Sequence, residues 1–381
     1  MDFNFTEEQL SLQDTLNRFI NKDYSFETRR QRVTADAHFD PAIWNTFAEL
    51  GILALPFHED FGGLNGTALD TYLVMRALAP GLVLEPYIST VILSGTLLQE
   101  AATPEQKATW IEDIATGATR YAFAHYEPES RYQETHVGTR AQKQGDTWLI
   151  NGHKAAVLDA KDVDYVLVSA RSNGDTSDAQ GISVFRIPLD TAGLSLKNYR
   201  THDGHSAADV ILNNVTVPAE ALIGTEGQAA SAIAQALAIT NTALIAEATG
   251  LIEALNNATL EYLKIRKQFG VPIGTFQALQ HRMAEMAIAA EQANSMALLA
   301  AMEMANPDPT QRLIKASGAK AYVGKLARHV AHEAVQMHGG IGVTDELNVA
   351  HFYKRITTIN MMFGDVDYHL ERYSDSLLNA A

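Results

Sequence analysis

The chain has 381 residues, which is too long for one small domain and predicts two or three packed units. Its 46% of hydrophobic and 19% of charged residues exclude a disordered chain. With 45 acidic against 29 basic residues, the net charge of −16 argues against nucleic acid or an anionic membrane surface as a general partner. The absence of cysteine excludes disulfides, thiol nucleophiles and thiolate metal ligands.

The sequence contains no recognisable targeting or membrane segment. The start MDFNFTEEQL has neither a basic n-region nor an apolar h-region, so we expect no secretory signal. No apolar run approaches the ~20 residues that a membrane-spanning helix needs. These features predict a cytoplasmic protein.

The first third of the chain predicts an N-terminal helical domain over residues 1–118. Ser, Thr or Asp before an apolar-periodic run is a helix start signal, strengthened by Gln three residues later or by Pro at the first helical position. Such signals occur at Thr6–Gln9, Asp40–Pro41 and Thr103–Gln106. Leu69–Leu78 is a further apolar-periodic stretch, which Pro80-Gly81 closes.

Residues 119–226 predict a middle β domain. Five short runs are rich in β-branched or aromatic residues: Tyr121–Tyr126, Trp148–Ile150, Tyr165–Ala170, Ile182–Ile187 and Val210–Val217. Turn signals such as Asn151-Gly152 separate them, and no helical pattern lies between them. About five strands at this spacing indicate a small antiparallel barrel or sandwich.

Residues 227–381 predict a C-terminal four-helix bundle. Gln228–Arg266 is rich enough in alanine, leucine and isoleucine for one long helix. Three later stretches are also predicted to be helical: Phe276–Met304, Thr310–His338 and Glu346–Leu378. We expect a break near Gly364 in the last of them. Four such stretches joined by short links are typical of an antiparallel bundle. The fold class is therefore mainly α with a middle β domain.

Two segments of this bundle are candidates for ligand binding. One is Arg266-Lys267-Gln268-Phe269-Gly270, followed by Phe276-Gln277. The other is Gln336–Gly342, which holds more glycines than a helix C-cap requires. Glycines let a backbone approach a phosphate or a sugar without an intervening Cβ. No grouping of His, Asp or Glu has metal-ligand spacing, so no metal site is predicted.

Taken together, the motifs of the chain resemble those of the acyl-CoA dehydrogenase family over essentially its whole length. The runs that carry the resemblance are PEQKATWI, Phe61-Gly62-Gly63, NNVTVPAEALIG, RKQFG, QALQHRMAEM and QMHGGIG. The resemblance implies the three domains above, FAD as cofactor, and α,β-dehydrogenation of an acyl-CoA thioester. In that reaction a carboxylate removes the α-proton while the β-hydride goes to the flavin.

The resemblance also implies which residues hold the cofactor. In the family, FAD lies across a subunit interface, and the neighbouring subunit contacts its ADP half, so we expect an oligomer. The motifs of that neighbour are intact here. The implied cofactor-binding residues are Arg266, Gln268, Phe269, Gln277, Gln336, Met337, His338, Gly339 and Gly340.

The motifs beside the flavin ring depart from the family pattern. Where the family has Thr-Glu-Pro-Gly-Ala-Gly-Ser-Asp, this chain has Tyr126-Glu127-Pro128-Glu129-Ser130-Arg131-Tyr132-Gln133. Where the family has Trp-Ile-Thr, it has Ala156-Val157-Leu158. These changes replace small residues with large ones and remove an aromatic wall and a hydroxyl donor.

No carboxylate occupies either position of the family's catalytic base. Gly364 aligns with the usual glutamate, and Thr240, followed by Asn241, aligns with the alternative one. Asp365 is a weak candidate, because one residue along a helix turns the side chain by about 100°. Asp367 is another, but a solvated acidic turn is the simpler interpretation of both.

Three hypotheses follow. The first is the small subunit of a heteromeric enzyme, similar to that of pimeloyl-CoA dehydrogenase, which contributes ADP-side contacts to the FAD of a catalytically complete partner. The second is a self-sufficient homo-oligomer with a displaced base such as Asp365. The third is a non-enzymatic relative that binds acyl-CoA or stabilises an assembly. The resemblance implies an acyl-CoA substrate and allows electron-transfer flavoprotein as the acceptor.

Overall fold

The computed structural model describes residues 5–378, which form two compact units. The helical unit comprises residues 5–34, 68–83 and 241–378, and the sheet unit comprises residues 35–67 and 84–240. The long helix α7 (Ala230–Ile265) begins in the sheet unit and continues into the helical unit. The three domain boundaries given above stay a prediction.

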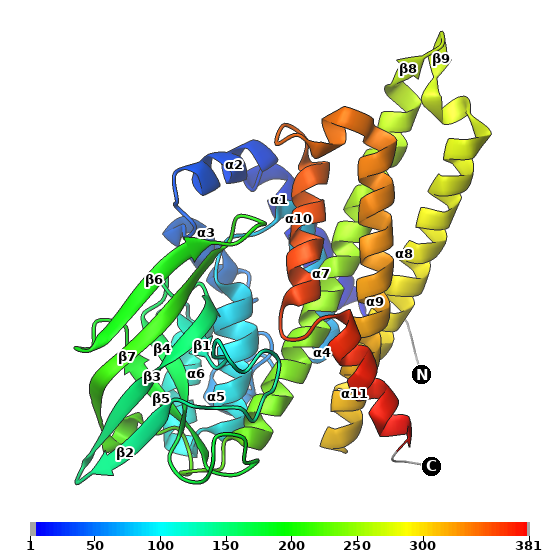
Figure 1. The fold of residues 1–381 in the computed structure, drawn as a ribbon. Coiled ribbons are helices and arrows are strands. Elements are labelled where there is room, and N and C mark those ends of the chain that lie inside the picture. The colour runs from blue at the N-terminus through cyan, green and yellow to red at the C-terminus, as the bar shows by residue number, and fades with distance from the viewer. Residues whose placement is uncertain (1–4, 379–381) are drawn as a thin grey trace. The chain divides into compact units, whose positions relative to one another are not determined.

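The helical unit contains eight of the described α-helices, including the later part of α7. The other seven are α1 (Glu7–Asp23), α2 (Phe26–Thr34), α4 (Ala68–Leu78), α8 (Gln277–Glu303), α9 (Pro309–His338), α10 (Asn348–Met361) and α11 (Val366–Leu378). Short 3-10 turns span Ala79–Gly81, Ile273–Thr275 and Gly339–Val343. In Figure 1, α8, α9, α10 and the later part of α7 run side by side.

The predicted bundle helices are confirmed, including the break near Gly364, which separates α10 from α11. Facing alanines such as Ala293 and Ala319 are almost completely buried, which lets α8 and α9 pack closely. A buried ion pair joins α10 to α7, because the Arg355 guanidinium donates to both carboxylate oxygens of Glu247. The sequence did not predict α2, whose residues are mostly polar and lack an apolar period.

The sheet unit combines helices with one curled sheet. Its helices are α3 (Pro41–Glu49), a π-helix (Tyr87–Ser94), α5 (Gly95–Ala101), α6 (Pro104–Ala115) and the first part of α7, with 3-10 turns at Glu59–Phe61 and Ala219–Ala221. Its strands are β1 (Tyr121–Ala124), β2 (Arg140–Gln144), β3 (Thr147–Leu158), β4 (Tyr165–Arg171), β5 (Ile182–Pro188), β6 (Leu194–Arg200) and β7 (Ser206–Pro218). The strand order is β1-β4-β2-β3-β7-β6, and β5 pairs with β4. One face of the sheet packs on an apolar core that includes Trp148, Val166 and Phe185.

All five predicted strand runs lie in this sheet, but two of its strands were not predicted. β2 and β6 are mostly exposed, so their sequences lack the apolar alternation that marks a half-buried strand. The expectation of a wholly antiparallel sheet was also wrong. β1 runs parallel to β4, with Tyr121 opposite Tyr165.

Two further properties concern the whole of residues 5–378. None of the helices formed by these residues is long and apolar enough to cross a membrane. Within the same range, no three His, Asp or Glu side chains group in a way that could hold a metal ion.

Candidate functional site

The first candidate segment forms a short hairpin, residues 266–272, after the end of α7. β8 (Lys267–Gln268) pairs with β9 (Val271–Pro272), and the turn residues Phe269 and Gly270 have φ angles of 54° and 83°. Positive φ at both central residues is typical of a two-residue hairpin turn. Figure 1 shows this hairpin projecting beyond the helix ends. The turn leaves Phe269 89% exposed, with its ring edge-on to Phe276.

Arg266 begins the hairpin and is exposed. Among residues 5–378, the structure records no ion pair that engages its guanidinium. Its planar fork of donors suits the paired oxygens of a pyrophosphate. Gln268 and Gln277, at the first position of α8, are exposed beside it. A hollow of about 620 Å³ lies next to the hairpin between α7 and α8, lined mainly by apolar residues such as Leu260, Leu263 and Met283.

The second candidate segment, residues 336–342, is called the glycine loop here and comprises the last three residues of α9 and the glycine-rich turn that follows them. Gly339 ends the helix with φ 65° and ψ −144°, a conformation that only glycine adopts readily. Gly340 has no such backbone requirement, and a Cβ placed there would meet nothing within 4 Å. No neighbour within the described chain therefore explains the absence of a side chain at Gly340.

Met337 and His338 of the same loop are buried, unlike Gln336, Gly339 and Gly340. The His338 Nδ1 lies 2.8 Å from the Ala334 carbonyl oxygen, and burial lowers the pKa of this imidazole. Its ring stacks on Tyr262 of α7, with centroids 4.4 Å apart. Tyr262 precedes the hairpin by one helical turn, so this contact fixes the glycine loop beside the hairpin.

The alternative base position on α7 carries polar groups of which all but the buried Asn241 Oδ1 are hydrogen-bonded. Thr240 is fully buried, and its hydroxyl donates to the Ala236 carbonyl oxygen at 2.7 Å. The Asn241 amide donates to the Phe363 carbonyl oxygen at 3.4 Å. Asn241 thus contacts the segment that carries the usual base position.

That usual position, Gly364, is closed by neighbouring side chains. Its φ angle is 117°, where L-residues are strained, and a Cβ there would lie 2.6 Å from Tyr368 Cδ1 and overlap the His369 ring. Burial lowers the pKa of His369 to about 3, so the ring is neutral at physiological pH. Its Nε2 lies 3.1 Å from the Phe363 carbonyl oxygen, to which it donates. The Gly364 turn, residues 362–365, therefore leaves no room for a side chain at the aligned base position.

The two nearby carboxylates begin α11. Asp365 Oδ1 accepts a hydrogen bond from the Tyr368 backbone amide at 2.9 Å, as a helix N-cap does. Asp367 is exposed in the first turn of α11, where a negative charge favours the helix dipole. Both carboxylates have a structural explanation.

In the sheet unit, the segment aligned with the family's flavin motif is held by a buried ion pair. The Lys154 ammonium donates to Glu127 Oε1 at 2.8 Å and to Ser169 Oγ at 3.0 Å. Burial lowers the pKa of Lys154 to about 8. Burial alone would raise the pKa of Glu127, but Lys154 and hydrogen bonds from Thr139 bring it down to about 2. This pair anchors the segment, whose later residue Arg131 is exposed with φ 47°.

The segment aligned with Trp-Ile-Thr lies at an irregularity of β3. The register with β7 shifts between Lys154 and Val157, and Ala156 has φ 53° there. Ala156 is exposed, and Leu158 is half-buried. The backbone bulge is present, but it carries neither an aromatic ring nor a hydroxyl.

Comparisons with known proteins decide the family. Models of the acyl-CoA dehydrogenase N-terminal, middle and C-terminal domains match residues 6–118, 122–215 and 229–378. The probable acyl-CoA dehydrogenase YngJ of Bacillus subtilis is 30% identical over 356 residues, covering 92% of each chain. The chain belongs to the acyl-CoA dehydrogenase family.

Two further relatives support this assignment. The structure of butyryl-CoA dehydrogenase from Megasphaera elsdenii is 27% identical and superposes with a TM-score of 0.92, covering 99% of this chain and 100% of that one. The caffeyl-CoA reductase-Etf complex subunit CarC of Acetobacterium woodii is 28% identical, covering 93% of this chain and 94% of that protein. The predicted family, fold class, enzyme class of oxidoreductase acting on CH–CH, and FAD cofactor are thereby confirmed.

The residues of the hairpin and the glycine loop fit the ADP half of FAD. Arg266 has a guanidinium that makes no ion pair among residues 5–378, Phe269 has an exposed ring, and Gly340 has open space around it. Sequence reasoning missed Tyr262, because an aromatic residue at a half-buried helix position is ordinary. It also missed the Lys154–Glu127 pair, although a lysine within an apolar strand was a visible signal.

Proposed function

We propose that this chain is the subunit without a catalytic base in a heteromeric FAD-dependent acyl-CoA dehydrogenase. Its hairpin and glycine loop would contact the ADP half of a FAD whose flavin ring is held by a catalytically complete partner subunit. The second subunit would supply the carboxylate that removes the α-proton of the acyl-CoA. When bound, FAD supplies the hydride acceptor.

The observation that carries this proposal is the closure of the Gly364 turn. If only the carboxylate had been lost at the base position, the turn would still have room for a side chain there. Here the backbone conformation and the Tyr368 and His369 rings exclude any side chain at residue 364. Meanwhile Arg266 is exposed without an ion pair among the described residues. Both observations support a division in which this chain binds the cofactor and its partner abstracts the proton.

In this enzyme the side chains of this chain would bind and orient the ADP half of FAD. Arg266 would neutralise the pyrophosphate, Gln268, Gln277 and Gln336 would donate amide hydrogen bonds, and Phe269 would exclude water from the adenosine. Met337 and His338 would not contact the cofactor but would hold the glycine loop in place, His338 by stacking on Tyr262. Electron-transfer flavoprotein is the proposed acceptor, a role that the CarC relative supports through its place in an Etf complex. The cytoplasmic location stays a prediction.

The test is co-expression with candidate partner acyl-CoA dehydrogenases, followed by measurement of flavin per chain and of acyl-CoA oxidation. We expect the isolated chain to hold little flavin and to lack activity, and the complex to regain both. Arg266→Ala should lower the flavin content of the complex, whereas Arg328→Ala, an exposed arginine on α9, should not. Full FAD occupancy and turnover in the isolated chain would contradict the proposal.

A further inference from the structure

One residue of α7, Tyr262, contacts both of the segments that would bind the ADP half of FAD. Its carbonyl oxygen accepts a hydrogen bond from the Arg266 backbone amide at 2.8 Å, where the helix passes into the hairpin. Its half-buried ring stacks on His338, with centroids 4.4 Å apart and ring planes inclined by 27°. Tyr262 therefore joins the hairpin to the glycine loop, although the two segments lie far apart in the sequence.

The glycine loop is folded around His338. The imidazole is buried, and its Nδ1 donates to the Ala334 carbonyl oxygen at 2.8 Å, which fixes the orientation of the ring. Gly342 returns to the same residue, because a Cβ there would lie 2.9 Å from the His338 Cβ. Gly339 and Gly340, between these two contacts, are exposed. His338 thus sets the path of the exposed backbone from within.

The hairpin is also held by contacts inside the chain. The Ile273 backbone amide donates to the Arg266 carbonyl oxygen at 2.8 Å, which closes the base of the hairpin. At the tip, the Phe269 ring lies edge-on to Phe276, with centroids 6.1 Å apart. Neither contact involves a group from outside the chain, so the hairpin has its shape before a ligand arrives.

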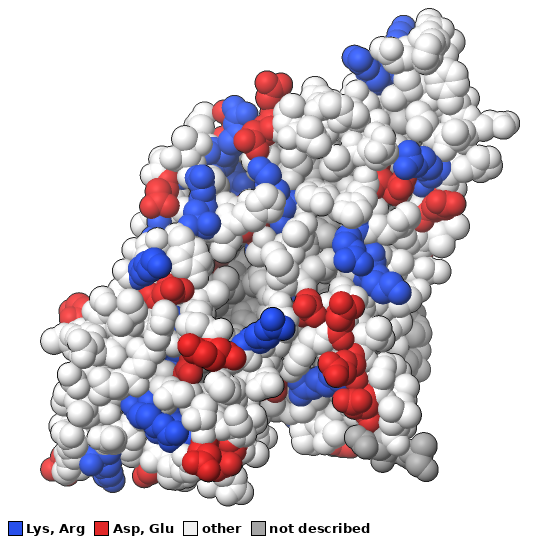
Figure 2. Space-filling model, in the orientation of Figure 1, with Lys and Arg blue, Asp and Glu red and all other residues white. Residues whose placement is uncertain are grey.

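The hairpin is a basic surface on an acidic protein. The chain has a net charge of −16, but residues 266–272 include Arg266 and Lys267 and no carboxylate. In the view of Figure 2, the projecting hairpin carries basic side chains and no acidic ones. Among residues 5–378, the structure records no ion pair for either side chain. A local cluster of this kind attracts a diphosphate in spite of the overall charge.

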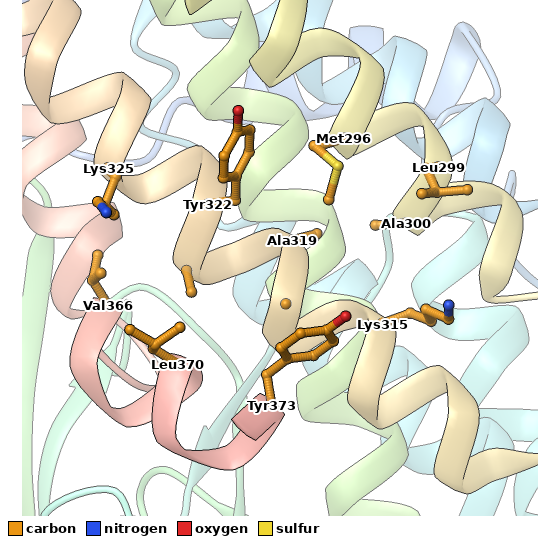
Figure 3. Close-up of a pocket in the computed structure, with 12 residues that line it drawn as sticks. Met296, Leu299, Ala300, Lys315, Ala319, Tyr322, Lys325, Val366, Leu370 and Tyr373 are labelled. Carbon is orange, nitrogen blue, oxygen red and sulfur yellow. The ribbon is translucent and has the colours of Figure 1, made fainter. Parts of the chain in front are cut away.

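The first half of α9 has a different surface. There Ala319, with Leu370 of α11, lines an apolar hollow of about 330 Å³ (Figure 3). Exposed apolar surface of this kind is typical of contacts between proteins. Among the described residues, none of the hairpin or the glycine loop lines this hollow. The features of α9 that suit a nucleotide therefore lie at its C-terminal end, beside Tyr262.

We propose that Tyr262 and His338 are positioning residues, which hold the hairpin and the glycine loop as one preassembled surface for ADP. This inference rests on the proposed function and adds that the surface exists before any partner binds. The isolated chain then binds free ADP, because a preformed site loses little conformational freedom on binding. The dissociation constant is roughly 0.1–1 mM, since a surface on one side leaves much of the nucleotide in water. Flavin is therefore still lost when the isolated chain is purified.

Titration of the full-length chain with ADP, followed by ligand-observed NMR, tests the inference. Tyr262→Leu should weaken binding about fivefold, because leucine fills space but offers no ring to hold the glycine loop. Tyr262→Phe keeps the ring and should bind within about twofold of the unchanged chain. Tyr353→Leu is the matched control, because Tyr353 of α10 stacks on His332 elsewhere in the helical unit, with centroids 5.5 Å apart. It should also stay within about twofold.

Two further measurements make the test independent of the stability of one variant. His338→Leu removes the same stack from the side of the glycine loop and should weaken ADP binding as Tyr262→Leu does. Gln336→Ala should weaken binding about threefold in the unchanged chain and hardly at all in the Tyr262→Leu chain, where the loop is no longer held beside the hairpin. Arg266→Ala should weaken binding in both, since the backbone hydrogen bond to residue 262 is kept.

Three results would overturn the inference. Equal losses of ADP binding with Tyr262→Leu and Tyr353→Leu would indicate a general loss of packing. Unchanged binding by Tyr262→Leu, beside weakened binding by Arg266→Ala, would remove the stack from the site but leave the proposed function standing. No binding of millimolar ADP to the unchanged chain would show that the surface is not preassembled, and the flavin content of the co-expressed complex would then decide the proposed function by itself.

Discussion

Three turns of the helical unit differ in whether their groups are exposed or closed off by neighbouring residues. The hairpin and the glycine loop expose Arg266, Phe269 and Gly340, and no contact within the described chain requires these residue types there. The Gly364 turn does the reverse, because Asn241 and His369 hydrogen-bond to the Phe363 carbonyl oxygen and the turn has no free space. Polar groups left open on a surface suit an external ligand, whereas a turn whose groups are satisfied internally cannot receive one.

The largest expected effect is a difference in stability between alanine substitutions at two glycines, one in the Gly364 turn and one in the glycine loop. Gly364→Ala should lower the free energy of unfolding by about 3 kcal/mol, because the new Cβ combines backbone strain with overlap of the His369 ring. Gly340→Ala should change it by less than about 0.5 kcal/mol, because its Cβ would meet open space. Urea unfolding of both variants measures the difference. Equal costs would show that the Gly364 turn is not closed.

Arg266→Ala should weaken FAD binding by the assembled complex by about 2 kcal/mol, or roughly thirtyfold, because a charge-assisted contact to the pyrophosphate is lost. Its unfolding free energy should remain unchanged, since the guanidinium makes no ion pair within the described chain. The FAD affinity of the Arg266→Lys complex should lie between those of the unchanged and the Arg266→Ala complexes, because lysine keeps the charge but lacks the planar fork of donors. Flavin fluorescence titration gives the affinities. A loss of stability without a loss of flavin would make Arg266 structural.

Lys320, which donates to the Ile359 carbonyl oxygen just before the Gly364 turn, should make that region sensitive to pH. Burial lowers its pKa from the ordinary value of 10.5 to about 7. Between these two values the unfolded chain keeps a proton that the folded chain has released, so stability rises with pH by up to about 1.4 kcal/mol per unit. Lys320→Met should remove this part of the slope. An unchanged slope between pH 7 and 10 would contradict the assignment.

The smallest effect concerns Asp365. Asp365→Ala should cost about 1 kcal/mol, since it removes the N-cap of α11. Asp365→Asn, which preserves a capping oxygen, should cost less. Neither variant should change the rate of α-proton exchange in the assembled complex, measured by deuterium incorporation into an acyl-CoA. A loss of exchange with Asp365→Asn would favour the self-sufficient enzyme with a displaced base.

The sequence by itself determined the order of elements and the positions of the motifs. Capping signals such as Thr6–Gln9 and the long apolar-periodic runs are local, so the helices that carry them could be predicted to within a few residues, whereas α2, α5 and the π-helix were not predicted. The polar strands β2 and β6 could not, because their pairing depends on partners distant in the chain. The absence of a carboxylate at residues 240 and 364 was likewise readable from the sequence alone.

Only the tertiary structure decided what those positions do. The sequence does not reveal that the Gly364 position is closed, since its φ of 117° and the approach of His369 arise from how α10 and α11 meet. It cannot separate the exposed Gly340 from the buried His338 two residues before it, because burial depends on Tyr262 of another helix. Helices and motifs follow from neighbouring residues, whereas an open or closed site follows from contacts between segments far apart in the chain.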